Sequence, residues 1–508
     1  MTRNATDSIM PRSLRPRSSA RSRLYGALTD SARACLFVGG LLAALSFFDG
    51  PAWLLAVSGF PIGIGFIFGD LKGARRGSLT PITVFAFASA LTALANATGL
   101  LTEHAPLRSQ YFTYAADSYL LLASQLALVG AVMAILGFKA ASRMEITRAV
   151  FSLLPRVHGD FPDRLLLIGG PIIALAAIAV HARLRSGFVG SIMSAVYLLP
   201  HIVSFLLARA GTGRRVRGAL AMAVAVASIE AIRALFMAYL RIDIVSPFIA
   251  LVLGALLGAR SLTPLRSRLF VPVYVFGAAF IIYFGAFAQA RTTSVGVERL
   301  QQVAQDAPAA PYGTTAKPGF WARLTNFNQL SQVGRIATED GFLHGQTLEY
   351  LGFVFVPRFL WPGKPIIQKG GWFAWRIGQA WIRPDGRYTN AVNMTVPGEL
   401  YLNYGWFGVV VGCALFGVFV ALLWSRTAFW SPHSGAVAAA FGYYLFWTSL
   451  TIAADLQTIV TLLAMYCIFV AIGLALRVLP NRTALHRRGR LLSWQHPASR
   501  RVTETSAV

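Results

Sequence analysis

The chain has 508 residues, of which 56% are hydrophobic and only 13% are charged, and its formal net charge is +26. Apolar runs recur along most of the sequence, and each is close to the ~20 residues that a helix needs to cross a bilayer. A soluble protein could not bury so many runs of this length. The composition therefore predicts an all-α polytopic membrane protein.

The positive charge suits nucleic-acid binding only if the protein is soluble. Here much of the charge sits in short segments between apolar runs, where it is typical of a topology signal. We therefore expect a membrane lipid environment and no nucleic-acid partner.

In chain order, residues 1–30 form a basic, Ser-rich segment that is also compatible with a transit peptide. No persuasive cleavage motif follows a short apolar core, so a cytoplasmic tail is the preferred interpretation. Apolar runs within residues 31–289 predict nine transmembrane helices, and runs within 405–477 predict three more, about 12 in all. Residues 478–508 form a second basic tail. The expected spans are 31–48, 51–69, 79–100, 117–138, 165–181, 188–208, 218–239, 245–259, 269–289, 405–425, 434–452 and 456–477.

The number of lysine and arginine residues alternates between high and low from one loop to the next. The loop after the sixth span holds four arginines, whereas each short loop on the opposite side holds at most two. Because cytoplasmic loops are enriched in basic residues, this pattern predicts that both termini are cytoplasmic. The expected location is therefore a cytoplasmic membrane, which in a Gram-negative bacterium is the inner membrane.

Residues 290–404 form one long loop that this topology places on the outer side, which is the periplasmic side if the cell is a Gram-negative bacterium. We expect short interfacial helices there, lying over a cavity. Cations outnumber acids in its second half, although the topology rule does not require cations on this side. Arginine and lysine suit an anionic head group, and interleaved Trp and Tyr suit either sugar stacking or anchoring at the membrane interface. A solvated loop with ordinary ion pairs is the alternative.

Ionisable side chains within membrane spans are costly to place in the bilayer, so each one is a candidate functional residue. Glu230 and Arg233 share a helix face, either as a neutralising pair or with Arg233 binding phosphate. Asp455 is either a helix cap or a carboxylate facing a cavity, and His201 is expected to be a packed core histidine. Cys35, Cys413 and Cys467 all lie in apolar segments, so no disulfide framework or thiolate metal site is expected.

Two motifs carry a family resemblance: VPRFLWPGKP at 356–365 and PGELYLNYGWFG at 397–408. Both resemble the Wzy-type oligosaccharide repeat-unit polymerases of O-antigen and exopolysaccharide assembly. The matching positions are Pro357–Arg358, Trp361–Pro362, Lys364–Pro365, Gly398, Glu399, Tyr401 and Asn403, together with the span arginine Arg233.

The resemblance implies a GT-C-like bundle that works without a metal or other cofactor. Such an enzyme moves a growing glycan from undecaprenyl pyrophosphate onto an incoming repeat unit on the same lipid. A flippase and a chain-length regulator are possible partners of such an enzyme. The implied pyrophosphate-binding candidates are Arg233, Arg358, Lys364, Arg376, Arg383 and Arg387. Glu399 is the first candidate for the base, with His344 and Asp455 as alternates. Sugar-binding candidates are Trp361, Tyr388, Tyr401 and Asn403.

Three other functions compete with a polymerase, and one of them is a structural assembly partner with no catalysis. An O-antigen ligase shares the donor lipid and the large outer loop but uses a different acceptor. A lipid-linked oligosaccharide flippase or transporter should show repeat symmetry and charged spans, neither of which is visible in the sequence.

Overall fold

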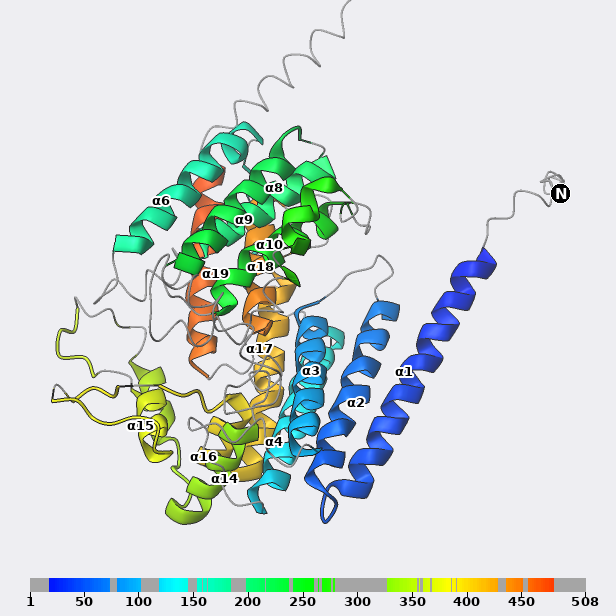
Figure 1. Cartoon of the computed structure of the whole chain (residues 1–508), viewed down its shortest axis with the longest axis vertical. Coiled ribbons are helices and arrows are strands. Elements are labelled where there is room, and N and C mark those ends of the chain that lie inside the picture. The colour runs from blue at the N-terminus through cyan, green and yellow to red at the C-terminus, as the bar shows by residue number, and fades with distance from the viewer. Residues whose placement is uncertain are drawn as a thin grey trace, which may run out of the picture.

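A computed structural model describes residues 18–73, 80–101, 118–144, 153–157, 159–161, 163–183, 198–214, 216–236, 241–259, 264, 267–275, 277–278, 327–353, 356, 360–365, 368–384, 386–389, 391–427, 435–450 and 456–478. Its named elements are all helices (Figure 1). Within these ranges the one β-pairing is an isolated bridge between Ile382 and Tyr388. The all-α prediction is therefore confirmed for the described residues.

The N-terminal part consists of four long helices. They are α1 (Ser18–Ser46), α2 (Ala52–Gly73), α3 (Pro81–Leu101) and α4 (Ser118–Arg143). Helix α1 packs on α2 and stands at the edge of the molecule, and α2 packs on α3 and α4 (Figure 1). Much of α1 is exposed, including Phe37, Leu41 and Leu45. An apolar helix with this exposure suits a lipid surface.

A second group packs around a hydrophobic core that it shares with residues from 436–447 and 462–469. It comprises η2 (Leu165–Gly169), α6 (Gly170–Arg183), α8 (Leu199–Arg209), η3 (Ala210–Arg214), α9 (Ala219–Phe236), α10 (Arg241–Ala259) and the short η5 (Arg268–Phe270). Helices α8, α9 and α10 contact one another. A Cβ built on Gly254 of α10 would lie 2.3 Å from the carbonyl oxygen of Phe205 in α8. Glycine therefore permits the close approach of these two backbones.

The C-terminal part begins with short helices and ends with long ones. They are α14 (Phe327–Asp340), η6 (Gln346–Gly352), α15 (Lys369–Arg376), α16 (Val396–Phe407), η7 (Gly408–Gly412), α17 (Cys413–Ser425), α18 (Ala436–Leu450) and α19 (Gln457–Val478). Helix α17 packs along α4, and α18 contacts α3, α8 and α19. A Cβ on Gly417 would lie 2.0 Å from the Ala134 carbonyl oxygen, and one on Gly137 would lie 2.1 Å from that of Ala414. Reciprocal glycines thus bring α4 and α17 into backbone contact.

The segment Val396–Ser425 is bent at Gly405, where φ is 60° and ψ is −149°. In a straight helix Leu400 and Gly412 would be roughly 18 Å apart. Instead, a Cβ on Gly412 would lie 2.6 Å from the Leu400 side chain. Pro397 and Cys413 also both lie against Gly130 of α4. Helix α16 therefore doubles back along η7, and we call Val396–Ser425 the helical hairpin.

Six helical segments of the described chain are long and apolar enough to cross a membrane. They begin at Ala27, Ala52, Pro81, Tyr119, Val396 and Gln457. Shorter apolar helices cover Leu165–Ala179, Val245–Ala259 and Ala436–Trp447. A polytopic membrane protein is thus supported, while the count of twelve spans remains a prediction. The expected span 269–289 is described only as far as residue 278.

Candidate functional site

The candidate site is built on the first turn of α16. Thr395 caps this helix, because its Oγ1 accepts a hydrogen bond from the Gly398 backbone N–H at 3.2 Å. Pro397 falls in the first turn, where its missing N–H costs no helical hydrogen bond. The capped start places Glu399 near the positive end of the helix dipole, which favours a carboxylate.

Glu399 is fully buried, and donors from three separate segments reach its carboxylate. Lys369 Nζ lies 2.8 Å from Oε1 and 2.9 Å from Oε2. The backbone N–H of Leu456 donates to Oε2 at 3.1 Å, and the Thr347 hydroxyl donates to Oε1 at 3.3 Å. Both oxygens are therefore engaged, as a buried charge requires. An acceptor hydroxyl could reach this carboxylate only by displacing one of these donors.

Lys369 begins α15, and its side chain is 7% exposed, whereas that of its partner Glu399 is 0% exposed. Besides Glu399, its ammonium group donates to the Tyr350 hydroxyl at 3.0 Å. It also lies 4.5 Å from the centroid of the Tyr350 ring, within cation–π range. Lys369 therefore joins α15 and η6 to the first turn of α16.

Asn403 lies one turn beyond Glu399 and organises the chain before η6. Its Nδ2 donates to the Glu399 carbonyl oxygen and to Thr347 Oγ1, both at 2.7 Å. Its Oδ1 accepts the Gly345 N–H at 2.9 Å, and its carbonyl oxygen accepts the His344 N–H at 3.1 Å. His344 has a positive φ of 48° and is exposed. A buried amide thus fixes the turn that carries an exposed imidazole.

We call Thr347, Tyr350, Lys369, Glu399 and Asn403 the Glu399 cluster. The structure brings together three residues that the sequence predicted: Glu399 and Asn403 within the cluster, and His344 beside it. Sequence reasoning missed Thr347, Tyr350 and Lys369 as site residues. Lys369 was visible only as one of several loop cations, because nothing local connects it with a carboxylate 30 residues further along the chain.

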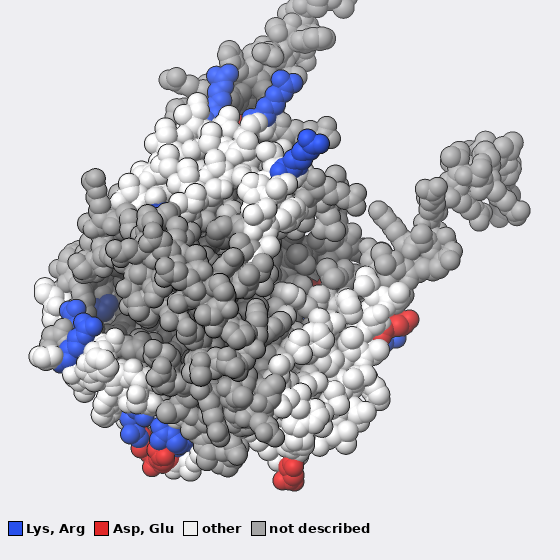
Figure 2. All heavy atoms as spheres, viewed as in Figure 1, with Lys and Arg blue, Asp and Glu red and all other residues white. Residues whose placement is uncertain are grey.

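The predicted cations of the loop are dispersed. Arg376 forms an ion pair with Asp340, beside a second pair between Arg335 and Glu339. Where α14 and α15 meet, basic and acidic side chains lie next to each other at the molecular edge (Figure 2). These contacts match the alternative expectation of ordinary ion pairs in the loop.

Lys364 donates to the Val356 carbonyl oxygen at 2.9 Å and lies 5.8 Å from the Phe353 ring centroid. Its neighbour Trp361 is 41% exposed and packs edge-on against Phe353. The second half of VPRFLWPGKP therefore folds into a small turn stabilised by its own lysine.

Arg383 and Arg387 are both exposed, and the Arg383 backbone N–H donates to the Arg387 carbonyl oxygen at 2.7 Å. The half-buried Tyr388 follows, and its ring lies against Gly371 of α15. Tyr401 packs edge-on against Phe342 and Trp406 at the bend of the helical hairpin. Tyr388 and Tyr401 are thus packed within the protein, and neither ring is fully free for sugar stacking.

Arg233 lies outside this group of contacts, on α9. Its guanidinium binds both carboxylate oxygens of Glu230, one of them at 2.9 Å, and both residues are buried. The neutralising pair expected from their spacing is therefore present. His201 is also buried, with Nε2 2.9 Å from the Ser246 hydroxyl and its ring stacked on Trp447.

Arg358 and Asp455 lie outside the described residues. Leu456, the residue after Asp455, donates its backbone N–H to Glu399. Leu456, directly before α19, therefore contacts the Glu399 cluster. Within the described ranges, no three His, Cys, Asp or Glu side chains are close enough together to hold a metal ion.

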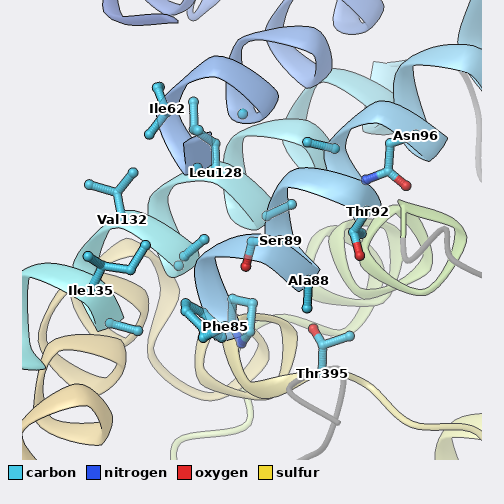
Figure 3. A pocket seen from close by; sticks show the side chains of 18 of the residues that line it. Ile62, Phe85, Ala88, Ser89, Thr92, Asn96, Leu128, Val132, Ile135 and Thr395 are labelled. Atoms are coloured by element: carbon cyan, nitrogen blue, oxygen red, sulfur yellow. The ribbon is translucent and has the colours of Figure 1, made fainter. Parts of the chain in front are cut away.

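A cavity of about 390 Å³ lies beside the start of the helical hairpin. Its walls come mainly from α2, α3 and α4, and it reaches Thr395, the cap of α16 (Figure 3). Most lining side chains are apolar, including Ile62, Val132 and Ile135. The sequence did not reveal this cavity, because its walls are ordinary apolar helix faces.

No protein-family model, curated protein or solved structure matches this chain. Its function must therefore be argued from its own sequence and geometry.

Proposed function

We propose that this chain is a membrane glycosyltransferase that polymerises a lipid-linked glycan. In this proposal it transfers the growing chain from undecaprenyl pyrophosphate onto an incoming repeat unit carried by the same lipid. The apolar helices support a membrane location. The resemblance of the two motifs to repeat-unit polymerases supports the reaction, and Glu399 and Asn403 of the second motif lie together in the structure.

The observation that carries the proposal is the exposed His344 beside the buried Glu399 cluster. A general base must reach the proton that it removes. Glu399 is enclosed and engaged by Lys369, Leu456 and Thr347, whereas His344 is exposed on a turn that Asn403 fixes. We therefore assign His344 as the proton acceptor and Asn403 as the residue that positions its turn, while Glu399 holds Lys369, Thr347 and Leu456 together. This reverses the order of preference drawn from the sequence.

The proposed reaction needs a base, an acceptor and a leaving group. His344 takes the proton from an acceptor sugar hydroxyl as that oxygen bonds to the anomeric carbon of the donor. The bond between that carbon and the phosphate oxygen breaks, and undecaprenyl pyrophosphate leaves with the electron pair. The exposed Arg383 and Arg387, with Arg358 of the first motif, are the candidates to stabilise the departing charge.

The test is deletion of the gene followed by complementation, with analysis of the surface glycan. A polymerase deletion leaves single repeat units on the lipid or core. Long chains that remain on undecaprenyl pyrophosphate would instead indicate a ligase, and repeat units trapped inside the cell would indicate a flippase.

Complementation with His344→Asn tests the assignment of the base. Asparagine tolerates positive φ better than most residues, so this change removes the imidazole with little backbone strain. We expect loss of long chains at normal protein abundance. Glu349→Gln, an exposed change in η6, is the matched control and should complement fully. Normal chain lengths with His344→Asn would refute the role of His344 but not the polymerase itself.

A further inference from the structure

The cavity between α2, α3 and α4 has features of a binding site. Its volume of about 390 Å³ falls within the about 300–1,000 Å³ that is common for small-molecule sites. Its walls belong to three helices that are candidate membrane spans. Phe87 lines the cavity and is also 49% exposed, so the cavity reaches the outer surface of the bundle. In a membrane that surface meets hydrocarbon chains.

The cavity also carries a polar stripe. Ser89, Thr92 and Asn96 all line it from α3 (Figure 3). Their spacing of three and four residues places them on one face of the helix. The stripe therefore suits a ligand that is mostly apolar but has hydrogen-bonding atoms.

Ser124 provides a second, independent indication. It lines the cavity from α4 and is only 2% exposed. Among the described residues, no group forms a hydrogen bond with its hydroxyl oxygen. Buried hydroxyls usually have a partner, so a bound molecule with an acceptor oxygen would complete the site.

We propose that this cavity binds one aliphatic chain of a membrane lipid, with an oxygen of that lipid bonded to Ser124. Lipid is favoured over a soluble ligand because the walls are apolar spanning helices and Phe87 connects the cavity to their outer surface. The proposal does not depend on polymerase activity. The cavity ends at Thr395, whose carbonyl oxygen accepts the N–H of Glu399 at 2.9 Å. A lipid held here would therefore lie beside the candidate site.

The experiment reconstitutes the full-length protein with lipids that carry a diazirine in the hydrocarbon chain. One arm uses a phosphatidylglycerol and the other a polyprenyl phosphate, and cross-linked peptides are mapped by mass spectrometry after irradiation. We expect labelling of peptides that contain Ser89 or Ser124 to exceed labelling of exposed α1 several-fold. Labelling in either arm supports the proposal, and the two arms identify the lipid. Labelling no stronger than that of α1 in both arms overturns it.

Two variants test the site directly. Ser89→Phe adds volume from α3 and Ser124→Leu adds volume from α4, so each should reduce labelling of the cavity several-fold. Gly40→Phe is the control, because Gly40 is exposed on α1 and a Cβ there would meet nothing within 4 Å. Each protein must first elute as a folded species. If Ser124→Leu does not, Ser124→Ala, which removes the hydroxyl without filling the cavity, replaces it. Labelling unchanged in both cavity variants overturns the proposal.

Discussion

The buried pair between Lys369 and Glu399 yields a quantitative prediction. Lys369→Met removes the ammonium group and keeps most of the apolar stem. Glu399 would retain the Leu456 N–H and the Thr347 hydroxyl as donors but lose its counter-charge. Leaving one member of a buried ion pair uncompensated costs about 3–5 kcal/mol.

The hydrogen bonds give a similar figure. Lys369 Nζ makes two bonds to the carboxylate, at 2.8 and 2.9 Å, and one to Tyr350 at 3.0 Å. Hydrogen bonds to charged groups contribute about 1.5–3 kcal/mol each. The two carboxylate bonds therefore total roughly 3–6 kcal/mol, which overlaps the range expected for a broken buried pair.

The assay is thermal unfolding of the purified protein in detergent, followed by tryptophan fluorescence. Lys369→Met should lower the midpoint strongly. Lys369→Met combined with Glu399→Gln should lower it less than the sum of the two single changes, because the double variant leaves no buried charge unpaired. Lys364→Met is the control and should change little, since Lys364 bonds a carbonyl oxygen in an exposed turn. Additive effects, or a Lys369→Met protein as stable as the unchanged one, would refute the buried-pair argument.

The remaining predictions concern other parts of the molecule. Gly417→Val should destabilise the protein by more than 1 kcal/mol, about the lower bound for overpacking, because its Cβ would meet the Ala134 carbonyl. Gly40→Val should leave the stability nearly unchanged. Equal unfolding midpoints for the Gly417→Val and Gly40→Val proteins would argue against close packing of α4 on α17. Glu230→Gln should lower the free energy of unfolding by about 3–5 kcal/mol, because Arg233 stays buried without its counter-charge. Adding Arg233→Met should restore part of that stability. A double variant no more stable than Glu230→Gln alone would contradict the pairing. In a cell-free polymerisation assay with lipid-linked units, activity should persist in EDTA and should fall in the His344→Asn variant. Loss of activity in EDTA would refute the metal-independent mechanism.

Much of the architecture follows from sequence because hydrophobic length is a local property. Each long apolar run predicts a helix, and the described helices α1 to α4 begin and end within a few residues of those predictions, apart from the start of α1. The start of α1 at Ser18 could not be anticipated from hydropathy, since the first helical turns are polar and basic.

The candidate site was predictable only in part. Glu399 and Asn403 are four residues apart, so a shared helix face follows from their spacing, and the structure confirms it through the bond from Asn403 to the Glu399 carbonyl. Lys369 could not be chosen among the other loop cations, because its pairing depends on how α15 packs against α16. Whether His344, Glu399 and Asn403 take part in catalysis stays a prediction.

The bend at Gly405 also affects how the protein threads through the bilayer. A hydropathy count treats Val396–Ser425 as one crossing. Because the limb before Gly405 lies alongside the limb after it, the two limbs do not add their lengths along one axis. Accessibility labels placed before and after Gly405 should consequently be interpreted as labels on two neighbouring limbs, not on the two ends of one straight span.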